Sequence, residues 1–270
     1  MKHVPACRLL YMFIVVLPLT IIQYSCSNNS TAGTTATNNR KQEYTVAAVL
    51  YHQQSGEWRA LSMQAFQLAT LRVKAALSKP HKRPLAIISD LDETLLDNSA
   101  FQAQLAIDDS SYTDSNWHEW SRAKKAKAMP GAREFLDFVT KNKVAIFYVT
   151  NRDSIDLPYT IENMAGLGYP QDTASHFKVY TDKGNKQARR EAVMKDYDVI
   201  LQLGDNLNDF SGAFYHKNYK ERKSIADSNA THFGVDYIVL PNPLYGDWEG
   251  ALYSTPNHDS IRHALLEGYK

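Results

Sequence analysis

Two aspartates separated by one residue lie directly after a short apolar run. Asp90 and Asp92 follow residues 85–88, which are Leu-Ala-Ile-Ile, and such a run is typical of a buried parallel strand. Open α/β sheets bind their ligands at the carboxyl ends of strands. There, one carboxylate can attack a substrate while the other transfers a proton. The alternative is structural, because either aspartate can also cap a helix that starts near Glu93.

Polar residues follow three other apolar runs further along the chain. Thr150 and Asn151 come after the first run, Lys186 comes shortly after the second, and Asp205 and Asp209 come after the third. If these runs are parallel strands of one sheet, their ends meet at the same edge. Taken singly, each residue has a structural explanation as a helix cap, a surface lysine or a turn. Taken together, they predict a site.

The composition of this predicted site suits phosphoryl transfer. Carboxylates alone would repel a phosphate dianion, but a divalent cation held by Asp90 and Asp205 would cancel that repulsion. Hard oxygen ligands favour Mg²⁺. A lysine and the Thr150 hydroxyl can carry the remaining charge on the phosphoryl oxygens. Either Lys186 or Lys183 can supply that lysine.

The elements that must position these residues alternate between strand and helix. This alternation predicts an α/β fold with a doubly wound, mainly parallel sheet and right-handed crossovers. N-terminal helices are expected between Tyr44 and Leu77, divided at Gly56, because apolar residues recur there at helical spacing. The expected strands are Leu85–Ser89, Val144–Val149, Phe177–Tyr180, Val199–Leu203 and Tyr237–Leu240, and the expected helices are Gly131–Lys141, Ser154–Leu167, Asn185–Lys195 and Leu207–Phe214.

A segment rich in aromatic and charged residues, at about 97–129, interrupts this alternation. Because it lies between the first strand and its crossover helix, we expect a small helical cap beside the site. Aromatic rings in such a position can stack on a nucleobase or another ring, although each ring can equally belong to the core. The candidates are Phe101, Trp117, Trp120 and, near the end of the domain, Tyr245.

The N-terminus has the pattern of a bacterial lipoprotein signal. Lys2 and Arg8 precede the apolar stretch Leu9–Ile22, which is too short for a comfortable membrane span, and Cys26 follows closely. These features predict a signal peptide over residues 1–25 and lipidation of Cys26. A cleaved secretory signal and an uncleaved anchor are the alternatives.

After the signal peptide, the composition of residues 26–43 predicts a flexible tether, and residues 44–270 are expected to form one domain. The tether is rich in Ser, Thr, Asn and Ala, and the domain is long enough for a proper α/β core. A chain beginning at Cys26 has a single cysteine and therefore no intramolecular disulfide. It keeps 28 basic and 29 acidic residues, which gives no indication of a nucleic acid polymer as partner.

Two long segments resemble the signatures of class C bacterial acid phosphatases, which are membrane-anchored lipoproteins of the haloacid dehalogenase (HAD) superfamily. The resemblance extends over about residues 44–255, and the order and spacing of the motifs agree with the family. Ser89 replaces an aliphatic residue, and Phe101 stands where a tyrosine is usual. The matching segments are 88–98, 117–120, 130–132, 200–210 and 245–249.

The resemblance implies a role for each candidate. Asp90 would be the nucleophile that forms an aspartyl-phosphate, and Asp92 would be the acid and base. Mg²⁺ would be held by the Asp90 carboxylate, the Asp92 backbone carbonyl and Asp205. Thr150, Asn151 and Lys186 would bind the phosphoryl group, with Lys183 as the second choice of lysine. Asp209 would orient Asp205 or the lysine, and Glu93 would have no catalytic role.

The function implied is Mg²⁺-dependent hydrolysis of small phosphate monoesters, such as nucleoside 5′-monophosphates and aryl phosphates, by an enzyme attached to the bacterial outer membrane. Two alternatives stay open at this point. One is a phosphotransferase that passes the phosphoryl group to an alcohol, and the other is a surface lipoprotein without activity. The sequence also leaves open whether the chain forms a homodimer.

Overall fold

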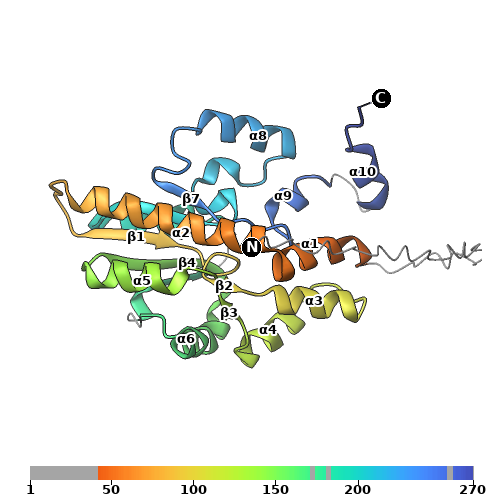
Figure 1. Ribbon diagram of the computed structural model, residues 1–270, viewed down its shortest axis with the longest axis horizontal. Coiled ribbons are helices and arrows are strands. Elements are labelled where there is room, and N and C mark those ends of the chain that lie inside the picture. The colour runs from red at the N-terminus through yellow and green to blue at the C-terminus, as the bar shows by residue number, and fades with distance from the viewer. Residues whose placement is uncertain (1–41, 171–173, 181–183, 254–257, 270) are drawn as a thin grey trace, which may run out of the picture. The chain divides into compact units, whose positions relative to one another are not determined.

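A computed structural model describes residues 42–170, 174–180, 184–253 and 258–269 (Figure 1). The predicted signal peptide over 1–25, Cys26, nearly all of the predicted tether and Lys183 lie outside the described residues. Expectations about them therefore stay predictions. Within the described part of the chain, no helix is both long and apolar enough to cross a bilayer.

The centre of the domain is a parallel sheet of five strands, as predicted from the alternation of strands and helices. Strand β1 is central, and its last residue, Ser89, pairs with Tyr148 on one side and Leu203 on the other. The Asp90 carboxylate therefore follows the central strand, between two neighbours that each carry predicted site residues. The strand order is β5 (Phe177–Tyr180), β4 (Ala145–Asp153), β1 (Leu85–Ser89), β6 (Asp198–Gly204) and β7 (Tyr237–Val239).

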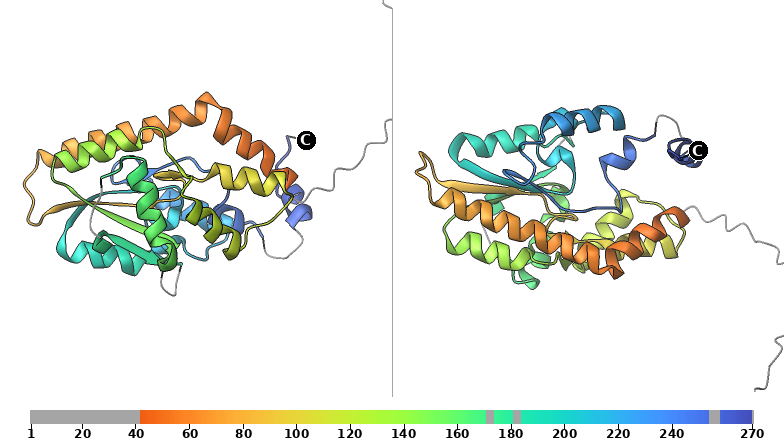
Figure 2. Two further views of the ribbon diagram at one scale, coloured as in Figure 1. Left: turned by 90° about the horizontal axis from the view of Figure 1, so that it is seen from below. Right: turned by 45° about the horizontal axis from the view of Figure 1, so that its top comes forward.

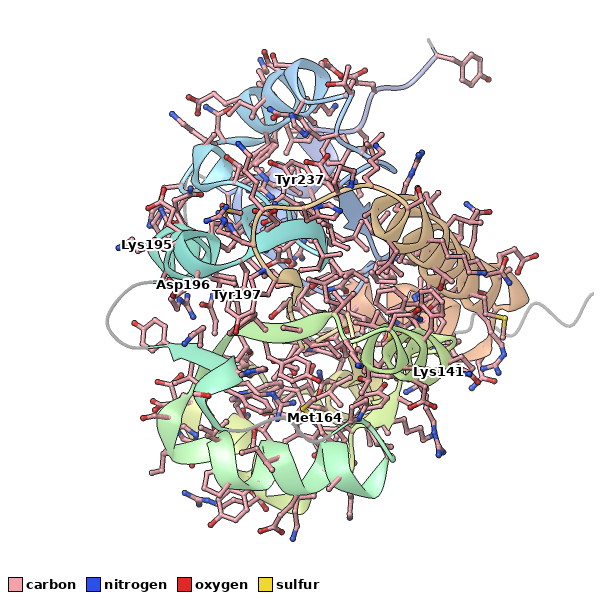
Figure 3. All side chains as sticks on the ribbon, turned by 90° about the vertical axis from the view of Figure 1, so that its left-hand side faces the viewer. Lys141, Met164, Lys195, Asp196, Tyr197 and Tyr237 are labelled. Carbon is pink, nitrogen blue, oxygen red and sulfur yellow. The ribbon has the colours of Figure 1, made fainter. Side chains whose placement is uncertain are left out.

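Helices cover both faces of this sheet. Ile87 belongs to the larger core cluster with α2 (Gly56–Leu77) and α5 (Ala132–Lys141), whereas its neighbour Ile88 packs in a second cluster with Val193 of α7. Successive strand residues point to opposite faces, so this division follows from the strand alone. In Figure 3, α5, marked by its last residue Lys141, and α7 (Gln187–Asp196) lie on opposite sides of the sheet.

The N-terminal helices α1 (Glu43–Gln54) and α2 divide where Gly56 predicted a break. Ser55 lies between them in an extended conformation, and its hydroxyl accepts a hydrogen bond from the Trp58 amide as an N-cap. Figure 2 shows the resulting change of direction between the two helices. It brings α1 against α3 (Ser99–Ile107).

The aromatic segment folds into two helices, α3 (Ser99–Ile107) and α4 (Asp114–Ala123). They lie between two short antiparallel strands, β2 (Leu96–Asp97) and β3 (Lys127–Ala128). Thr113 begins α4 with a capping box that includes the Asn116 side chain. We call residues 98–126 the cap.

One predicted helix is wrong. Residues 207–214 form two short 3₁₀ turns, η3 (Leu207–Asp209) and η4 (Gly212–Phe214), in place of one α-helix. The side chains of Asn206 and Ser211 accept hydrogen bonds from backbone amides two residues ahead, which favours separate turns over a continuous helix.

Other boundaries also differ from the prediction. Strand β4 continues to Asp153, so Thr150 and Asn151 belong to the strand and do not follow it. Its outer pairing with β5 is irregular at this point, which accommodates the extension. The predicted helix over 154–167 is a 3₁₀ turn, η1 (Ser154–Asp156), followed by α6 (Leu157–Gly166). The helices α8 (Tyr219–Ser228), α9 (Asp247–Gly250) and α10 (His258–Ala264) were not predicted.

Candidate active site

A buried lysine joins two aspartates at the edge of the sheet. Lys186 Nζ lies 2.7 Å from Asp90 Oδ1 and 2.7 Å from Asp209 Oδ1. All three side chains are nearly inaccessible to solvent. Burial raises the pKa of Asp90 to about 7, although the Lys186 charge opposes this rise. The structure thus brings together residues that are far apart in the sequence, from the ends of β1 and β6 and the start of α7.

Asp205 completes a cluster of carboxylates beside this lysine. Its oxygens accept hydrogen bonds from the Thr94 hydroxyl at 3.1 Å and the Asn242 amide at 2.8 Å. Burial raises its pKa well above the usual range, and the charges of Asp209 and Asp90 raise it further. A single lysine does not neutralise three such carboxylates.

These carboxylates fit a divalent cation. Asp90, Asp205 and Asp209 each offer an oxygen, and the three oxygens lie within 4.8 Å of one another. An all-oxygen donor set suits a hard cation such as Mg²⁺. The predicted set had the Asp92 backbone carbonyl in place of a third carboxylate. Asp209 was expected to have an orienting role, and it does contact the lysine directly.

Asp92 contacts a buried arginine. Arg152 donates to Asp92 Oδ1 from Nε at 3.0 Å and from Nη2 at 2.7 Å, and Nε also lies 3.1 Å from Oδ2. Asn98 Nδ2 donates to Asp92 Oδ1 at 2.8 Å. These bonds fix the direction of the Asp92 carboxylate.

Thr150 and Asn151, the predicted phosphate-binding pair on β4, differ in their access to the cavity. The Thr150 side chain is fully buried, and its hydroxyl accepts a hydrogen bond from the Arg152 amide at 3.1 Å. Asn151 lines the cavity, and its carboxamide is held between Arg189 and the Gly184 carbonyl. Of the two, only Asn151 presents its side chain to the cavity.

Glu93 occupies an unusual position for a carboxylate. It has a φ of 55° and a fully buried side chain that accepts hydrogen bonds from the backbone and side chain of Asn98 and from the Tyr245 hydroxyl. Burial, together with the charges of Asp92 and Asp205, raises its pKa well above the usual range. Glu93 therefore connects the loop after β1 to Tyr245 without entering the cavity.

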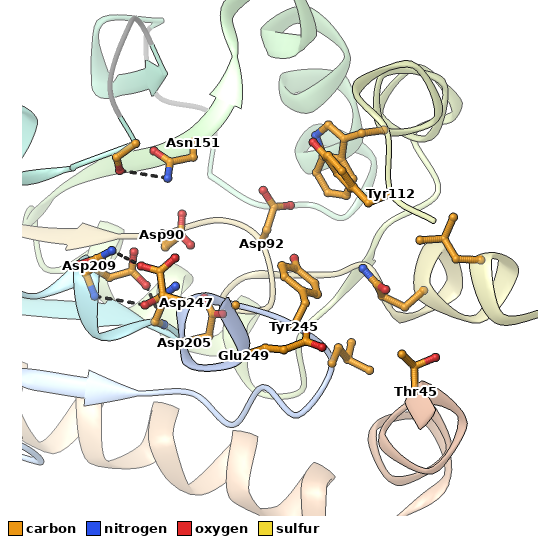
Figure 4. Close-up of a pocket in the computed structure, with 18 of the residues that line it drawn as sticks. Thr45, Asp90, Asp92, Tyr112, Asn151, Asp205, Asp209, Tyr245, Asp247 and Glu249 are labelled. Atoms are coloured by element: carbon orange, nitrogen blue, oxygen red, sulfur yellow. Dashed lines mark hydrogen bonds between the residues drawn. The ribbon is translucent and has the colours of Figure 1, made fainter. Parts of the chain in front are cut away.

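A cavity of 1090 Å³ extends from the aspartates towards α1 and the cap. In Figure 4, Asp90, Asp205 and Asp209 lie at one end, and Tyr112 and Tyr245 lie towards the other. Trp117 and Tyr245, two of the four predicted substrate aromatics, line it, and their contact with a substrate stays a prediction. Phe101 and Trp120 lie behind the lining, where Phe101 is buried against the rings of Tyr112, Trp117 and Trp120.

Gly204 permits the close approach of two site elements. A Cβ atom at this position would lie 2.3 Å from the Asp209 Cβ, so Asp209 or its turn would have to shift. Asp209 also accepts a hydrogen bond from the Asn206 amide at 2.9 Å, which closes the turn after β6. The glycine thus allows Asp205 and Asp209 to share one side of the site.

Sequence reasoning assigned no role to three residues of this site. Arg152 directly follows the two predicted phosphate ligands, and this position could have indicated that it belongs to the site. Asn98 lies at the end of the first signature, but its partners come from three separate segments. Tyr112 lies in the aromatic segment, and nothing in the sequence distinguishes it from the rings that turn inwards.

Comparisons with known proteins agree with this geometry. The family described as HAD superfamily, subfamily IIIB (acid phosphatase) matches residues 15–248. The class C acid phosphatase from Bacillus anthracis superposes with a TM-score of 0.81 and 37% identity, covering 85% of this chain and 99% of that one. The tungstate-bound structure of that enzyme superposes with a TM-score of 0.82 and 36% identity, and the match covers 86% of this chain and 100% of that one.

A plant relative is more distant. Acid phosphatase 1 of Solanum lycopersicum is 23% identical over 164 residues, which is 58% of this chain, and the match spans 57% of that protein's length. The match to the family extends over most of the chain and includes every residue of the carboxylate and lysine cluster. The chain therefore belongs to the acid phosphatases of HAD subfamily IIIB and has the fold of the class C enzymes.

Proposed function

We propose that this protein hydrolyses phosphate monoesters through an aspartyl-phosphate on Asp90. The observation that carries the proposal is the 2.7 Å contact between Asp90 and the buried Lys186, in a cluster with Asp205 and Asp209. A nucleophilic carboxylate, a fixed cation and a potential metal site thus lie side by side at one end of the cavity. This combination is what phosphoryl transfer requires, because its catalysis is mainly positioning and electrostatic stabilisation.

The reaction has two steps. In the first, an Asp90 oxygen attacks phosphorus while the bond from phosphorus to the leaving oxygen breaks, and Asp92 gives that oxygen a proton. In the second, Asp92 takes a proton from water as the water oxygen attacks phosphorus. The bond from phosphorus to Asp90 then breaks, phosphate leaves, and both aspartates return to their initial states.

Lys186 holds Asp90 in place and places a positive charge where the phosphoryl oxygens will lie. Asp90, Asp205 and Asp209, with the Asp92 backbone carbonyl, would hold Mg²⁺. When bound, this ion would offset the carboxylate charges and polarise the phosphoryl group. Asn151, held by Arg189 and the Gly184 carbonyl, directs its carboxamide into the same cavity.

We propose substrates whose leaving alcohol carries a flat ring, such as nucleoside 5′-monophosphates, or is itself aromatic, as in aryl phosphates. The far part of the cavity is lined by Tyr112, Trp117 and Tyr245, and the cavity volume of 1090 Å³ is well above that of a phosphate ion. Aromatic side chains bind flat rings by stacking. Tungstate, a tetrahedral oxyanion that binds the Bacillus anthracis enzyme, is expected to inhibit by occupying the phosphate position.

The nucleophile is tested by Asp90→Asn, measured with p-nitrophenyl phosphate and Mg²⁺. The variant keeps the size of the side chain but removes the attacking charge, so activity should fall at least ~10⁴-fold. The matched control is Asp227→Asn on the exposed side of α8, which should retain full activity. Undiminished turnover by the Asp90 variant would overturn the assignment.

We further propose that the protein is exported and anchored to the outer membrane through a lipid on Cys26. The basic start, the apolar stretch and the cysteine that follows it support this proposal. Mass spectrometry of the mature N-terminus from a bacterial membrane fraction should detect a diacylated Cys26. An unmodified cysteine, or a different cleavage site, would contradict it.

A further inference from the structure

Asn98 lies at the junction between the aspartate loop and the cap. It is fully buried at the start of α3. Its Nδ2 donates to Asp92 Oδ1 at 2.8 Å and lies 3.3 Å from a Glu93 oxygen. Its Oδ1 accepts from Trp120 Nε1 at 2.8 Å and from Arg152 Nη2 at 3.3 Å. One carboxamide thus connects the Asp92 carboxylate to the cap helix α4.

The orientation of this carboxamide is set by its partners. The indole N–H of Trp120 and the guanidinium of Arg152 are donors only, so the amide atom that faces them must be the oxygen. The amino group is then directed at Asp92 and Glu93, which both accept. Trp120, with the shorter of the two bonds, and Arg152 therefore determine together which end of Asn98 the Asp92 carboxylate meets.

Trp120 itself is held by packing. Its ring centroid lies 6.1 Å from that of Phe101, which is buried in the cap. Among the described residues, those that line the cavity include neither of these two rings. The indole is thus a poor candidate for contact with a substrate. Its polar nitrogen has a clear partner in Asn98.

We propose that Asn98 and Trp120 are positioning residues for Asp92, so that the cap controls proton transfer to the leaving group. This proposal rests on the proposed function, in which Asp92 protonates the leaving oxygen. A general acid must lie within hydrogen-bond reach of that oxygen. The Asn98 amide and Arg152 fix the carboxylate in one direction, and Trp120 keeps the amide turned the right way.

The proposal has a specific kinetic signature. A substrate with a good leaving group, such as p-nitrophenyl phosphate, needs little proton transfer, whereas glycerol phosphate has a poor leaving group that needs it. A misplaced Asp92 should therefore slow glycerol phosphate hydrolysis far more than that of p-nitrophenyl phosphate. General loss of structure would reduce both rates by the same factor.

The decisive variants are Trp120→Phe and Asn98→Asp. Trp120→Phe removes the indole donor and keeps an aromatic ring, and it should lower kcat/KM for glycerol phosphate ~10-fold more than for p-nitrophenyl phosphate. Asn98→Asp keeps the shape of the side chain but places an acceptor opposite the Asp92 oxygen. It should lower kcat/KM for glycerol phosphate ~100-fold more than for p-nitrophenyl phosphate. Equal losses on the two substrates would overturn the proposal.

Two controls distinguish a failure of the positioning role from a failure of the proposed acid role of Asp92. Phe135→Leu weakens a buried ring of α5 that packs against Phe66 and lies outside the cap, so it should lower the unfolding temperature and leave the ratio of the two rates unchanged. Asp92→Asn should show the largest differential loss of all. If Asp92→Asn shows none, the acid role of Asp92 in the proposed function fails. If it shows the loss and the Trp120 and Asn98 variants do not, only the positioning role fails.

Discussion

The sheet edge and the cap contribute to the same cavity but are built in different ways. At the sheet edge, Asp90, Lys186 and Asp209 are held by the parallel strands and by ion pairs of 2.7 Å. In the cap, Phe101 and Trp120 are held by ring packing and a single indole hydrogen bond. Among the residues that line the cavity, the sheet edge contributes the charged groups and the cap contributes aromatic rings.

This difference separates the groups that meet the phosphoryl centre from the rings that surround the rest of the cavity. Residues at the ends of central strands cannot move without disturbing the sheet, which suits groups that must meet a phosphoryl centre. The rings of the cap that line the cavity lie away from that centre. We therefore expect changes at the sheet edge to affect kcat, and changes at the cavity side of the cap to affect KM.

The largest of these effects is expected for Lys186→Met. The change removes the cation between Asp90 and Asp209, so kcat should fall ~10²–10³-fold. The unfolding temperature in the absence of metal should also change, because two buried carboxylates lose their partner. Steady-state kinetics and thermal unfolding test this, with Lys141→Met on the exposed end of α5 as the control. A change confined to KM would contradict the assignment of Lys186 to the chemical step.

The next effect tests how closely the sheet edge is packed. Gly204→Ala places a Cβ against the Asp209 side chain, so the free energy of unfolding should fall by ~1–3 kcal/mol and activity should fall with it. The control is Gly166→Ala in α6, where the new Cβ has no neighbour within 4 Å. Denaturant unfolding measures both. Equal stability of the two variants would show that Asp209 can move freely.

Removal of metal should reveal the repulsion among the aspartates. Burial raises the pKa of Asp90 to about 7 and that of Asp205 well above its usual range. A carboxyl whose pKa is raised by folding stabilises the protein fully below its unfolded pKa, and that contribution is lost as the pH rises through the folded pKa. The metal-free protein should therefore lose stability between about pH 4 and pH 7.

Mg²⁺ should reverse this loss, because it binds the ionised carboxylates. Thermal unfolding with EDTA or with MgCl₂ would measure the effect, and the stabilisation by Mg²⁺ should be larger at about pH 8 than at about pH 5. Asp205→Asn should reduce it. Equal stabilisation at both pH values would argue against metal binding by these groups.

The smallest effect concerns the two sides of the cap. Trp117→Leu removes a ring that lines the cavity, so KM for AMP should rise ~10-fold, while KM for glycerol phosphate should change little. Phe101→Leu removes a buried ring behind the lining, so it should reduce stability by ~1 kcal/mol and change neither KM. A similar rise in KM for both variants would remove the distinction between the lining and the packing behind it.

The sheet edge could be predicted from the sequence better than the cap and the turns. The five strands and the meeting of Asp90, Lys186 and Asp205 could be predicted, because parallel strands end at one edge and the apolar runs mark them clearly. The turns at 207–214 could not, because local side-chain hydrogen bonds from Asn206 and Ser211 override helix propensity there.

The interior of the cap was also beyond prediction. Trp117 and Trp120 lie three residues apart in a helix, and only tertiary packing decides that one lines the cavity and the other donates to Asn98. The contact between Arg152 and Asp92 joins residues sixty positions apart. It depends on the extension of β4 past its predicted end.

The most direct test of the central claim is to trap the phosphorylated enzyme. In an Asp92→Asn variant the second step should be slow, because the base that activates water is gone. Rapid acid quenching after mixing with p-nitrophenyl phosphate and Mg²⁺, followed by peptide mass spectrometry, should find one phosphoryl group on the peptide that contains Asp90. Release of p-nitrophenol with no phosphorylated peptide, or with the group on another residue, would contradict the account.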